Sequence, residues 1–284
     1  MSRAGWLNAA LAVGVAALGA FFYFRPARDT GAEFPLSALK PEEALSLRIE
    51  RAGAEPLVLE KRQDGWFVTA PFAARADGSR VQRLLAIAQA RVAHQLPAGD
   101  PGRFGLAPPQ ARIVVDGRTF SFGLVNEITR EQYVMSGNAV YAVHPRFGMA
   151  LPARAADAAS RQLFGPHELP ERFEAGRFTV AQQGGRWTLA PDGGELSQDD
   201  FIRWVDEWRL ASALRVELRS AARVQDEIRI RLKSGGGFAL GVLSREPDLV
   251  LARSDEKLQY HFRAELAQRL LSPPTARDEP AGKK

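Results

Sequence analysis

Cysteine is absent from this 284-residue chain, which excludes disulfide bonds, thiolate metal sites and cysteine nucleophiles. Histidine is scarce as well, and no two of the four histidines have the spacing that places two metal ligands on one helix face. They are His94, His144, His167 and His261. A Gly-x-Ser-x-Gly motif is also missing, so an esterase-type nucleophile has no support. From these absences we expect no catalytic residue, no metal and no cofactor.

Lysine is the third scarce residue, so nearly all the basic side chains are arginines. The formal net charge is +5, which suits either an ordinary solvated surface or attraction to anionic lipids or polymers. The densest basic series is a candidate anionic-ligand patch that consists of Arg215, Arg219, Arg223, Arg229 and Arg231. Nucleic acid is not an expected partner, because no basic helix, zinc-finger spacing or aromatic RNA-binding signature accompanies the charge.

Charged residues are missing between Trp6 and Phe24, an apolar run of 19 residues. A helix needs about 20 such residues to cross a bilayer, so residues 1–25 are predicted to form one uncleaved transmembrane anchor. A cleaved signal peptide is the alternative, with small residues suited to cleavage at 17–20. The arginines before and after the run are too evenly distributed to fix its orientation. Residues 26–43, which contain three prolines, are predicted to be a linker.

From residue 44 onward, apolar residues alternate with polar ones, as in half-buried antiparallel strands. In the first module, residues 44–152, the pattern predicts one helix from about Ser79 to Ala93, which either Asp77 or Ser79 would cap. The dipeptide Asp116-Gly117 predicts a tight hairpin. The strands of this module are predicted at 45–50, 57–60, 66–69, 112–115, 119–123, 131–135 and 139–143.

The same order of elements occurs a second time. The segments 65–71 and 185–191 both read as a tryptophan-bearing strand that ends at proline and precedes an amphipathic helix. In the two helices the apolar positions lie 120 residues apart, with Val81, Leu84, Leu85 and Ala88 matching Phe201, Trp204, Val205 and Trp208. Self-similarity at a fixed period indicates an internal duplication.

We therefore predict an α+β fold with two modules, each an antiparallel sheet packed on an amphipathic helix. The second module spans residues 169–271, a connecting helix spans 153–168, and the charged, proline-rich tail at 272–284 is expected to be disordered. Strands of the second module are predicted at 177–182, 186–190, 227–233, 238–243, 249–252 and 258–262, and helices at 198–210 and 263–271. Gly235-Gly236-Gly237 lies between two strands, so it predicts a hairpin turn rather than a phosphate site.

The apolar positions of each helix form one stripe along its surface, and these stripes predict which side chains are buried. Spacings of three and four residues line one helix face, so Leu84, Leu85, Trp204 and Val205 are expected to be almost fully buried. Trp208, near the end of its helix, is expected to be partly exposed or to contact the other module, and is a candidate partner contact. The acidic residues of this helix are Asp199, Asp200, Asp206 and Glu207. Asp199 and Glu207 each lie four residues from Arg203, which suits exposed ion pairs better than catalysis. Asp199 and Asp200 in the first turn complement the helix dipole.

Several motifs resemble the bacterial domain-of-unknown-function family 4340. The segments that carry the resemblance are Leu59 to Trp66, the strand end at Ala70-Pro71, Val81 with Leu84-Leu85, Phe104-Gly105-Leu106 with Pro108-Pro109, and Tyr133 with Val140 to Val143. The resemblance covers residues 45–143 and reaches the second module only through the duplication. It implies a membrane-anchored bacterial protein that accompanies ABC-type export systems of the gliding-motility kind, and it supplies no catalytic residues.

The function expected from the sequence is that of a non-enzymatic, membrane-tethered accessory or scaffolding module, for a transport assembly of the ABC type. The alternative is a binding module for an anionic lipid or envelope polymer through the arginine-rich face. An enzyme would need a pocket that joins charged residues of both modules. The expected location is the bacterial inner membrane with one span and periplasmic modules, as the resemblance implies, and a protein partner in the envelope is expected.

Overall fold

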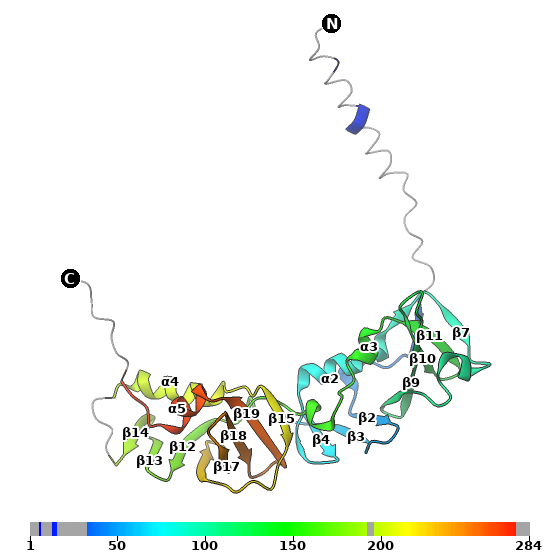
Figure 1. Cartoon of the computed structure of the whole chain (residues 1–284). Coiled ribbons are helices and arrows are strands. Elements are labelled where there is room, and N and C mark those ends of the chain that lie inside the picture. Colours follow the sequence, from blue (N-terminus) through cyan, green and yellow to red (C-terminus); the bar gives the residue numbers. More distant parts are fainter. Residues whose placement is uncertain (1–5, 7–12, 16–32, 192–195, 277–284) are drawn as a thin grey trace.

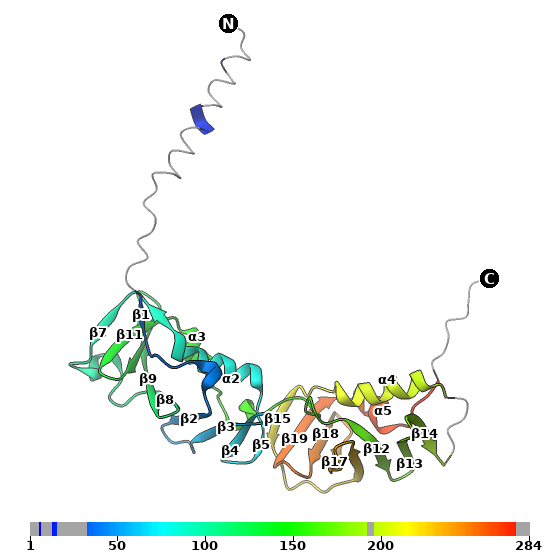
Figure 2. The ribbon, with the colours of Figure 1, turned by 180° about the vertical axis from the view of Figure 1, so that it is seen from behind.

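The computed structural model describes residues 6, 13–15, 33–191 and 196–276. Their two large antiparallel sheets follow each other along an elongated molecule, with helix α2 (Gly78–Leu85) beside the first sheet and α4 (Gln198–Arg209) beside the second (Figures 1 and 2). A third, two-stranded sheet is formed by β1 (Phe34–Pro35) and β6 (Arg91–Val92). The described chain is thus mostly β-sheet with a few helices, and the expected α+β class is confirmed.

The predicted transmembrane anchor, residues 1–25, lies outside the described residues except at four positions. Those four, Trp6 and residues 13–15, are helical. Within the described part of the chain, no helix has both the length and the apolar character needed to span a membrane.

The first sheet has nine strands, and its two edges are β5 and β7. In spatial order the strands are β5 (Ala74–Arg75), β4 (Gly65–Ala70), β3 (Leu57–Arg62), β2 (Ser46–Arg51), β8 (Ala111–Val115), β9 (Arg118–Val125), β10 (Gln132–Ser136), β11 (Ala139–Val143) and β7 (Gln95–Pro97). The predicted hairpin at Asp116-Gly117 is confirmed, because it joins β8 to β9 with both residues at positive φ.

The second sheet has eight strands, and its edges are β14 and β15. The spatial order is β14 (Arg186–Ala190), β13 (Phe178–Gln183), β12 (Pro170–Ala175), β16 (Asp226–Leu232), β17 (Gly237–Ser244), β18 (Asp248–Arg253), β19 (Leu258–Arg263) and β15 (Arg215–Leu218). The spatial orders of the two sheets match strand for strand. The order β4, β3, β2, β8, β9, β10, β11, β7 in the first sheet corresponds to β14, β13, β12, β16, β17, β18, β19, β15 in the second. Trp66 in β4 and Trp187 in β14 hold the same place in the two orders.

The alternating pattern explains which face of each strand is buried. In β16 the side chains of Ile228, Ile230 and Leu232 are buried, whereas Arg229 and Arg231 between them are exposed. The inner faces of both sheets and the buried stripes of α2 and α4 belong to one hydrophobic core, because period-two strands and period-3.6 helices each present one apolar side.

The buried helix stripes follow the prediction. Leu84, Leu85, Trp204 and Val205 are all buried, so the expected burial is confirmed. Asp77 caps α2 by accepting from the backbone N–H of Arg80, and Ser197 and Asp200 form a capping box at the start of α4.

The first helix is shorter than predicted. After Leu85 the chain tightens into a 3-10 helix, η2 (Ala86–Gln89), and then extends into β6 (Arg91–Val92). Strand β6 pairs with β1 (Phe34–Pro35). The prediction of helix up to Ala93 was wrong because this pairing holds residues 91 and 92 in an extended conformation.

The predicted linker and tail are more ordered than expected where the structure describes them. Residues 33–43 pack on the first module: Leu36 is buried, and the Ser37 hydroxyl donates to the carbonyl of Ala88 at 2.7 Å. The segment also contains a 3-10 helix, η1 (Pro41–Glu43). In the tail, the carbonyl of Ser272 accepts from Trp204 Nε1 at 3.0 Å. Tail residues 277–284 lie outside the described residues.

The prediction of a connecting helix at residues 153–168 was wrong. Only a 3-10 helix, η4 (Ala155–Ala158), forms there, and the rest is extended or bent. The alanine-rich sequence favours a helix locally, but the backbone of the segment bonds to both modules instead. Ser160 N donates to the carbonyl of Arg75, and Leu163 N donates to the carbonyl of Ala211.

These bonds make the connector a bridge between the sheets. On the first side, Ala76 pairs with Ala159 beside β5. On the second side, Ala213 N donates to the carbonyl of Arg161, and Leu214 N donates to the backbone carbonyl of His261 in β19. A path of backbone hydrogen bonds therefore runs from β4 and β5 through the connector to β19, and it fixes the two sheets edge to edge.

The remaining described helices are short. Helix α3 (Arg146–Met149) follows β11, and η3 (Pro101–Phe104) precedes β8. The predicted closing helix is observed as α5 (Glu265–Leu271), which lies beside α4 (Figure 1). After η3 the chain turns at Gly105, whose φ of 67° suits glycine.

Candidate functional site

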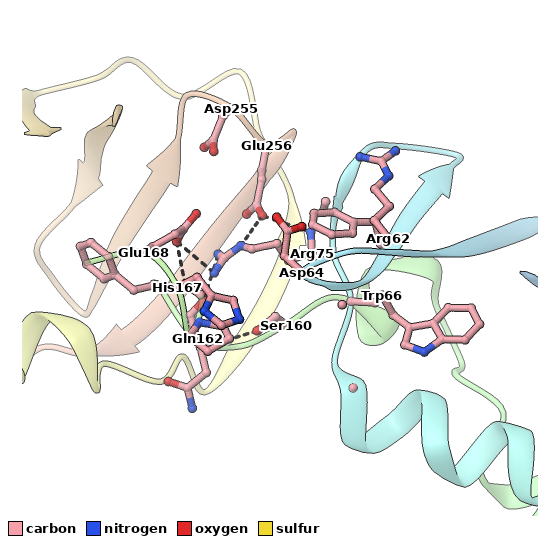
Figure 3. Close-up of a pocket in the computed structure, with 18 of the residues that line it drawn as sticks. Arg62, Asp64, Trp66, Arg75, Ser160, Gln162, His167, Glu168, Asp255 and Glu256 are labelled. Atoms are coloured by element: carbon pink, nitrogen blue, oxygen red, sulfur yellow. Dashed lines mark hydrogen bonds and ion pairs between the residues drawn. The ribbon is translucent and has the colours of Figure 1, made fainter. Parts of the chain in front are cut away.

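A cleft of about 690 Å³ lies where the two modules meet. Figure 3 shows its lining side chains, which come from three parts of the chain. The first module contributes the β3–β4 turn, β4 and β5; the connector contributes residues 160–168; and the second module contributes the end of α4 and the turn between β18 and β19. The backbone bridge described above brings these segments together.

Arg75, on the edge strand β5, reaches from the first module into the second. Its Nε donates to Glu256 Oε1 at 2.9 Å, and its backbone N–H donates to the same oxygen at 3.2 Å. Its Nη2 donates to the carbonyls of Gln162 and Leu163 at 3.1 and 3.3 Å. Arg75 therefore contacts the connector and the β18–β19 turn at once.

Arg253, at the end of β18, holds the other side of this arrangement and is only 1% exposed. It forms a two-bond ion pair with Glu168, in which Nη1 and Nη2 each lie 2.9 Å from a different carboxylate oxygen. It forms a second such pair with Asp255, at 2.9 and 2.7 Å. Its guanidinium also lies 3.6 Å from the ring centroid of Phe238, a favourable cation–π contact.

The two arginines share their acidic partners. Glu168 Oε2 lies 3.5 Å from Arg75 Nη1 and 2.9 Å from Arg253 Nη1. The hydroxyl of Tyr260 donates to the second oxygen of Glu256. We call Arg75, Glu168, Arg253, Asp255, Glu256 and Tyr260 the inter-module ion network.

The pKa shifts in the network show which charges it stabilises. Burial opposes the ionisation of Glu168, but hydrogen bonds and charge from Arg253, with a further contribution from Arg75, outweigh burial and lower the pKa of Glu168. The pKa of Asp255 is lowered in the same way, with burial outweighed by Arg253. Burial and the neighbouring Glu256 both raise the pKa of Tyr260, so this phenol remains a hydrogen-bond donor.

The chemistry of the network follows from these partners. Carboxylates that are held ionised by arginine are poor proton donors near neutral pH. Both oxygens of Glu168 and of Glu256 are already engaged. The cleft does join charged residues of both modules, the condition stated above for an enzyme, but the geometry of these charges suits a structural cross-link. Within the described residues, no group of three or more His, Asp or Glu side chains could hold a metal ion.

The predicted arginine patch is not one surface. Arg215 is on β15, at an edge of the second sheet, where it pairs with Glu217 and Asp248. Arg229 and Arg231 are on β16, and β17, β18 and β19 lie between the two strands. At a strand spacing of about 4.8 Å, β15 and β16 are roughly 19 Å apart. Arg219 and Arg223 are exposed in the loop that joins them. The five arginines therefore do not form one compact cluster, and their role in binding an anionic ligand stays a prediction.

Trp208 is the other predicted site residue, and it is buried at 1% exposure. Its ring centroid lies 5.6 Å from Phe173 of β12 and 6.0 Å from Trp204. The expectation of partial exposure was wrong because the aromatic side chains of β12 and α4 enclose the indole, and Trp208 therefore presents no surface to a partner.

Two smaller expectations are also corrected. Arg203 pairs with Asp200, at 2.7 Å and three residues apart, rather than with Asp199 or Glu207. Glu207 instead pairs with Arg269 of α5. Among the histidines, His261 is buried, and its ring contacts Arg215, Glu217 and Gln259, so it has a structural role in the second sheet.

Sequence reasoning missed every residue of the inter-module ion network. Arg75, Glu168 and Glu256 lie in short strands, turns or the connector, where no periodic pattern points to a shared site. The one available signal is Arg253, which directly follows the apolar run Leu249 to Ala252. A charge at the end of a buried strand needs a partner.

Comparison with known proteins identifies the family to which the chain belongs. The model of the family described as "Domain of unknown function (DUF4340)" matches residues 66–231, which is more than half of the chain. This range includes part of each module and the whole connector. Neither the curated proteins nor the solved structures contain a match to the chain.

Proposed function

We propose, from the premise that this chain belongs to the DUF4340 family, that it is a non-enzymatic, membrane-tethered accessory protein that positions a protein partner in the bacterial envelope. The partner we propose is a transport assembly of the ABC type. The inner membrane, with the modules in the periplasm, is the location we propose with it. The support for the membrane tether is the apolar run at 6–24 in the sequence.

The observation that carries the scaffolding proposal is the set of hydrogen bonds and ion pairs that joins the two modules. Two domains in one chain usually move relative to each other unless a large or tightly bonded interface joins them. Here, the backbone bridge and the inter-module ion network cross the junction together. Arg75 bonds to the second module through both its backbone and its side chain. A protein built this way presents its two sheets at a fixed angle, as a scaffold must.

We also infer that the two modules arose by duplication. The support is the shared order of eight strands, the equivalent positions of Trp66 and Trp187, and a proline directly after both tryptophan strands, Pro71 and Pro191. Duplication gives a scaffold two similar faces from one folding unit. A pairwise superposition of the two modules that places Trp66 and Trp187 in different elements would refute the inference.

The proposed function is tested by affinity purification of the full chain, tagged after Lys284, from detergent-solubilised membranes of its natural host. The expected result is co-purification of transporter subunits after cross-linking. Recovery of the chain alone, with no enriched envelope protein, would contradict a scaffold. Extraction from membranes by alkaline carbonate would separately contradict the membrane tether, because an integral helix resists this treatment whereas a peripheral protein does not.

A further inference from the structure

The cleft between the modules has room beyond the inter-module ion network. Its walls include Phe67 of β4, Phe164 and Pro166 of the connector, and Leu210 after α4. Leu210 is 75% exposed, a large apolar side chain at the cleft mouth. The volume of about 690 Å³ is within the range of about 300–1,000 Å³ usual for binding pockets. Binding pockets combine apolar surface with polar groups that orient the ligand, and the lining of this cleft has both.

The charges of the lining restrict the ligand. The lining has four carboxylates (Asp64, Glu168, Asp255 and Glu256) and three arginines (Arg62, Arg75 and Arg209). Arg253, behind the wall, balances the fourth carboxylate. With no excess of positive charge, the cleft offers no electrostatic attraction to a phosphorylated ligand or an anionic polymer.

Polar groups at the rim are available to a ligand. In the described part of the chain, the side chains of Asp64, Gln162 and His167 have no hydrogen-bond or ion-pair partner, and Figure 3 shows them around the cleft. Together they offer both donors and acceptors. A polypeptide has the matching combination, because its backbone carries donors and acceptors and its side chains can be apolar.

We propose that this cleft binds an extended, mainly apolar peptide segment of a protein partner, one without net negative charge. The segment does not extend the sheet at β5, because Ser160 N already donates to the carbonyl of Arg75 at 2.8 Å and Ala76 already pairs with Ala159. Recognition therefore depends on apolar side chains that enter the cleft beside Phe164 and Leu210. This proposal rests on the proposed function, since it locates where the scaffold holds its partner.

The test uses the full chain in lipid nanodiscs and a random peptide library displayed on phage. Selected peptides are synthesised, and their dissociation constants are measured by fluorescence anisotropy. We expect apolar peptides without net negative charge, and at least about tenfold weaker binding to Leu210→Ser than to the matched control Leu214→Ser. Both leucines are exposed, but only Leu210 lines the cleft.

Two more variants test the cleft without relying on Leu210. Ala73 is an exposed lining residue, so Ala73→Trp should fill the cleft and reduce peptide binding by a similar factor while the protein stays folded. Asp64→Lys should change binding of charged peptides, whereas Glu60→Lys, an exposed substitution on β3 outside the cleft, should not. Equal binding to Leu210→Ser and Leu214→Ser, selection of acidic peptides, or no enrichment over empty nanodiscs would each overturn the proposal.

The outcomes also separate this proposal from the proposed function. Co-purification of a transporter that is as efficient with Leu210→Ser as with the parent would leave the scaffold intact and remove the cleft as its binding site. Cleft-dependent peptide binding by a chain that co-purifies no envelope protein would support the cleft as a peptide site and contradict the proposed scaffold.

Discussion

Arg75 Nε and the backbone N–H of Arg75 both donate to the same oxygen of Glu256, at 2.9 and 3.2 Å, although the two residues are 181 positions apart in the chain. The carboxylate thus links the β18–β19 turn of the second module, to which Glu256 belongs, to the edge strand β5 of the first module. Its other oxygen accepts from Tyr260. The position of the β18–β19 turn relative to β5 is determined by these bonds, and so are two walls of the cleft.

The first prediction concerns the strength of this contact. Glu256→Gln removes the charge and leaves the buried arginines with one anion fewer, so the free energy of unfolding should fall by about 3–5 kcal/mol. Replacing both partners, in Arg75→Met with Glu256→Leu, should cost less than the sum of the two single changes. Urea denaturation followed by circular dichroism measures the stability of Glu256→Gln, of the two single variants Arg75→Met and Glu256→Leu, and of the double variant.

The control for this prediction is an exposed ion pair. Arg229 and Glu227 pair at 2.9 Å on the solvent face of β16, and Arg229→Ala should change the stability by less than about 1 kcal/mol. Equal losses for Glu256→Gln and Arg229→Ala would mean that the inter-module ion network does not hold the modules together.

The second prediction concerns acid. In the folded protein the pKa of Glu168 lies below its ordinary value of 4.5 and that of Asp255 lies below 3.8, because Arg253 outweighs burial in both cases. The unfolded chain therefore binds protons more readily than the folded one, and the stability that these groups contribute above pH 4.5 is lost as the pH falls through their folded pKa values. Between pH 5 and pH 3, Glu168→Gln should lose less stability than the parent. Parallel slopes for the two proteins would contradict this account.

The third prediction concerns His261 and a milder pH range. Burial and the nearby Arg215 outweigh Glu217 and Asp248 and lower the pKa of His261 below 6.5. Protonation therefore favours the unfolded chain, so stability should decline as the pH falls below about 6.5, the ordinary histidine pKa. His261→Gln should remove the part of that decline that falls between pH 7 and the folded pKa. A parent protein whose stability rises on acidification through this range would show that the sign is wrong.

The sequence predicted local structure well where one periodic signal dominates. The strand of Leu47 and Ile49 and the helix stripe of Leu84 and Leu85 are examples, because each buries one face against a single core. Asp116-Gly117 specified its turn by backbone chemistry alone. In contrast, β12 and β15 were not predicted, since the segments Pro-Glu-Arg-Phe-Glu-Ala and Arg-Val-Glu-Leu contain too many charged residues to show an apolar alternation.

The errors share a physical cause, which is that contacts distant in sequence overrode local preference. The alanines at 155–159 favour a helix, but the extended connector gains backbone bonds to Arg75 and Ala211. Trp208 is enclosed by Phe173 of β12, a strand that the sequence did not reveal. The cleft itself depends on residues from three segments, and no spacing within one segment could indicate it.

The last prediction concerns the aromatic centre of the second module. Trp204 packs edge-on against Phe173, with ring centroids 4.9 Å apart, and against Phe178 at 6.1 Å, and its Nε1 donates to the carbonyl of Ser272. Trp204→Ala removes these contacts and leaves a cavity, so it should lower the free energy of unfolding by about 3–5 kcal/mol. In the first module, Leu85→Ala should cost about 2–5 kcal/mol for the same reason.

The matched control is Ile202→Ala, on the exposed side of the same helix. Loss of its half-exposed side chain is offset by the higher helix propensity of alanine, so the stability should stay within about 0.5 kcal/mol of the parent. Thermal unfolding followed by circular dichroism compares the three variants without depending on tryptophan fluorescence. If Trp204→Ala melted at the temperature of Ile202→Ala, the buried face of α4 would not stabilise the second module, and its aromatic stripe would need another role.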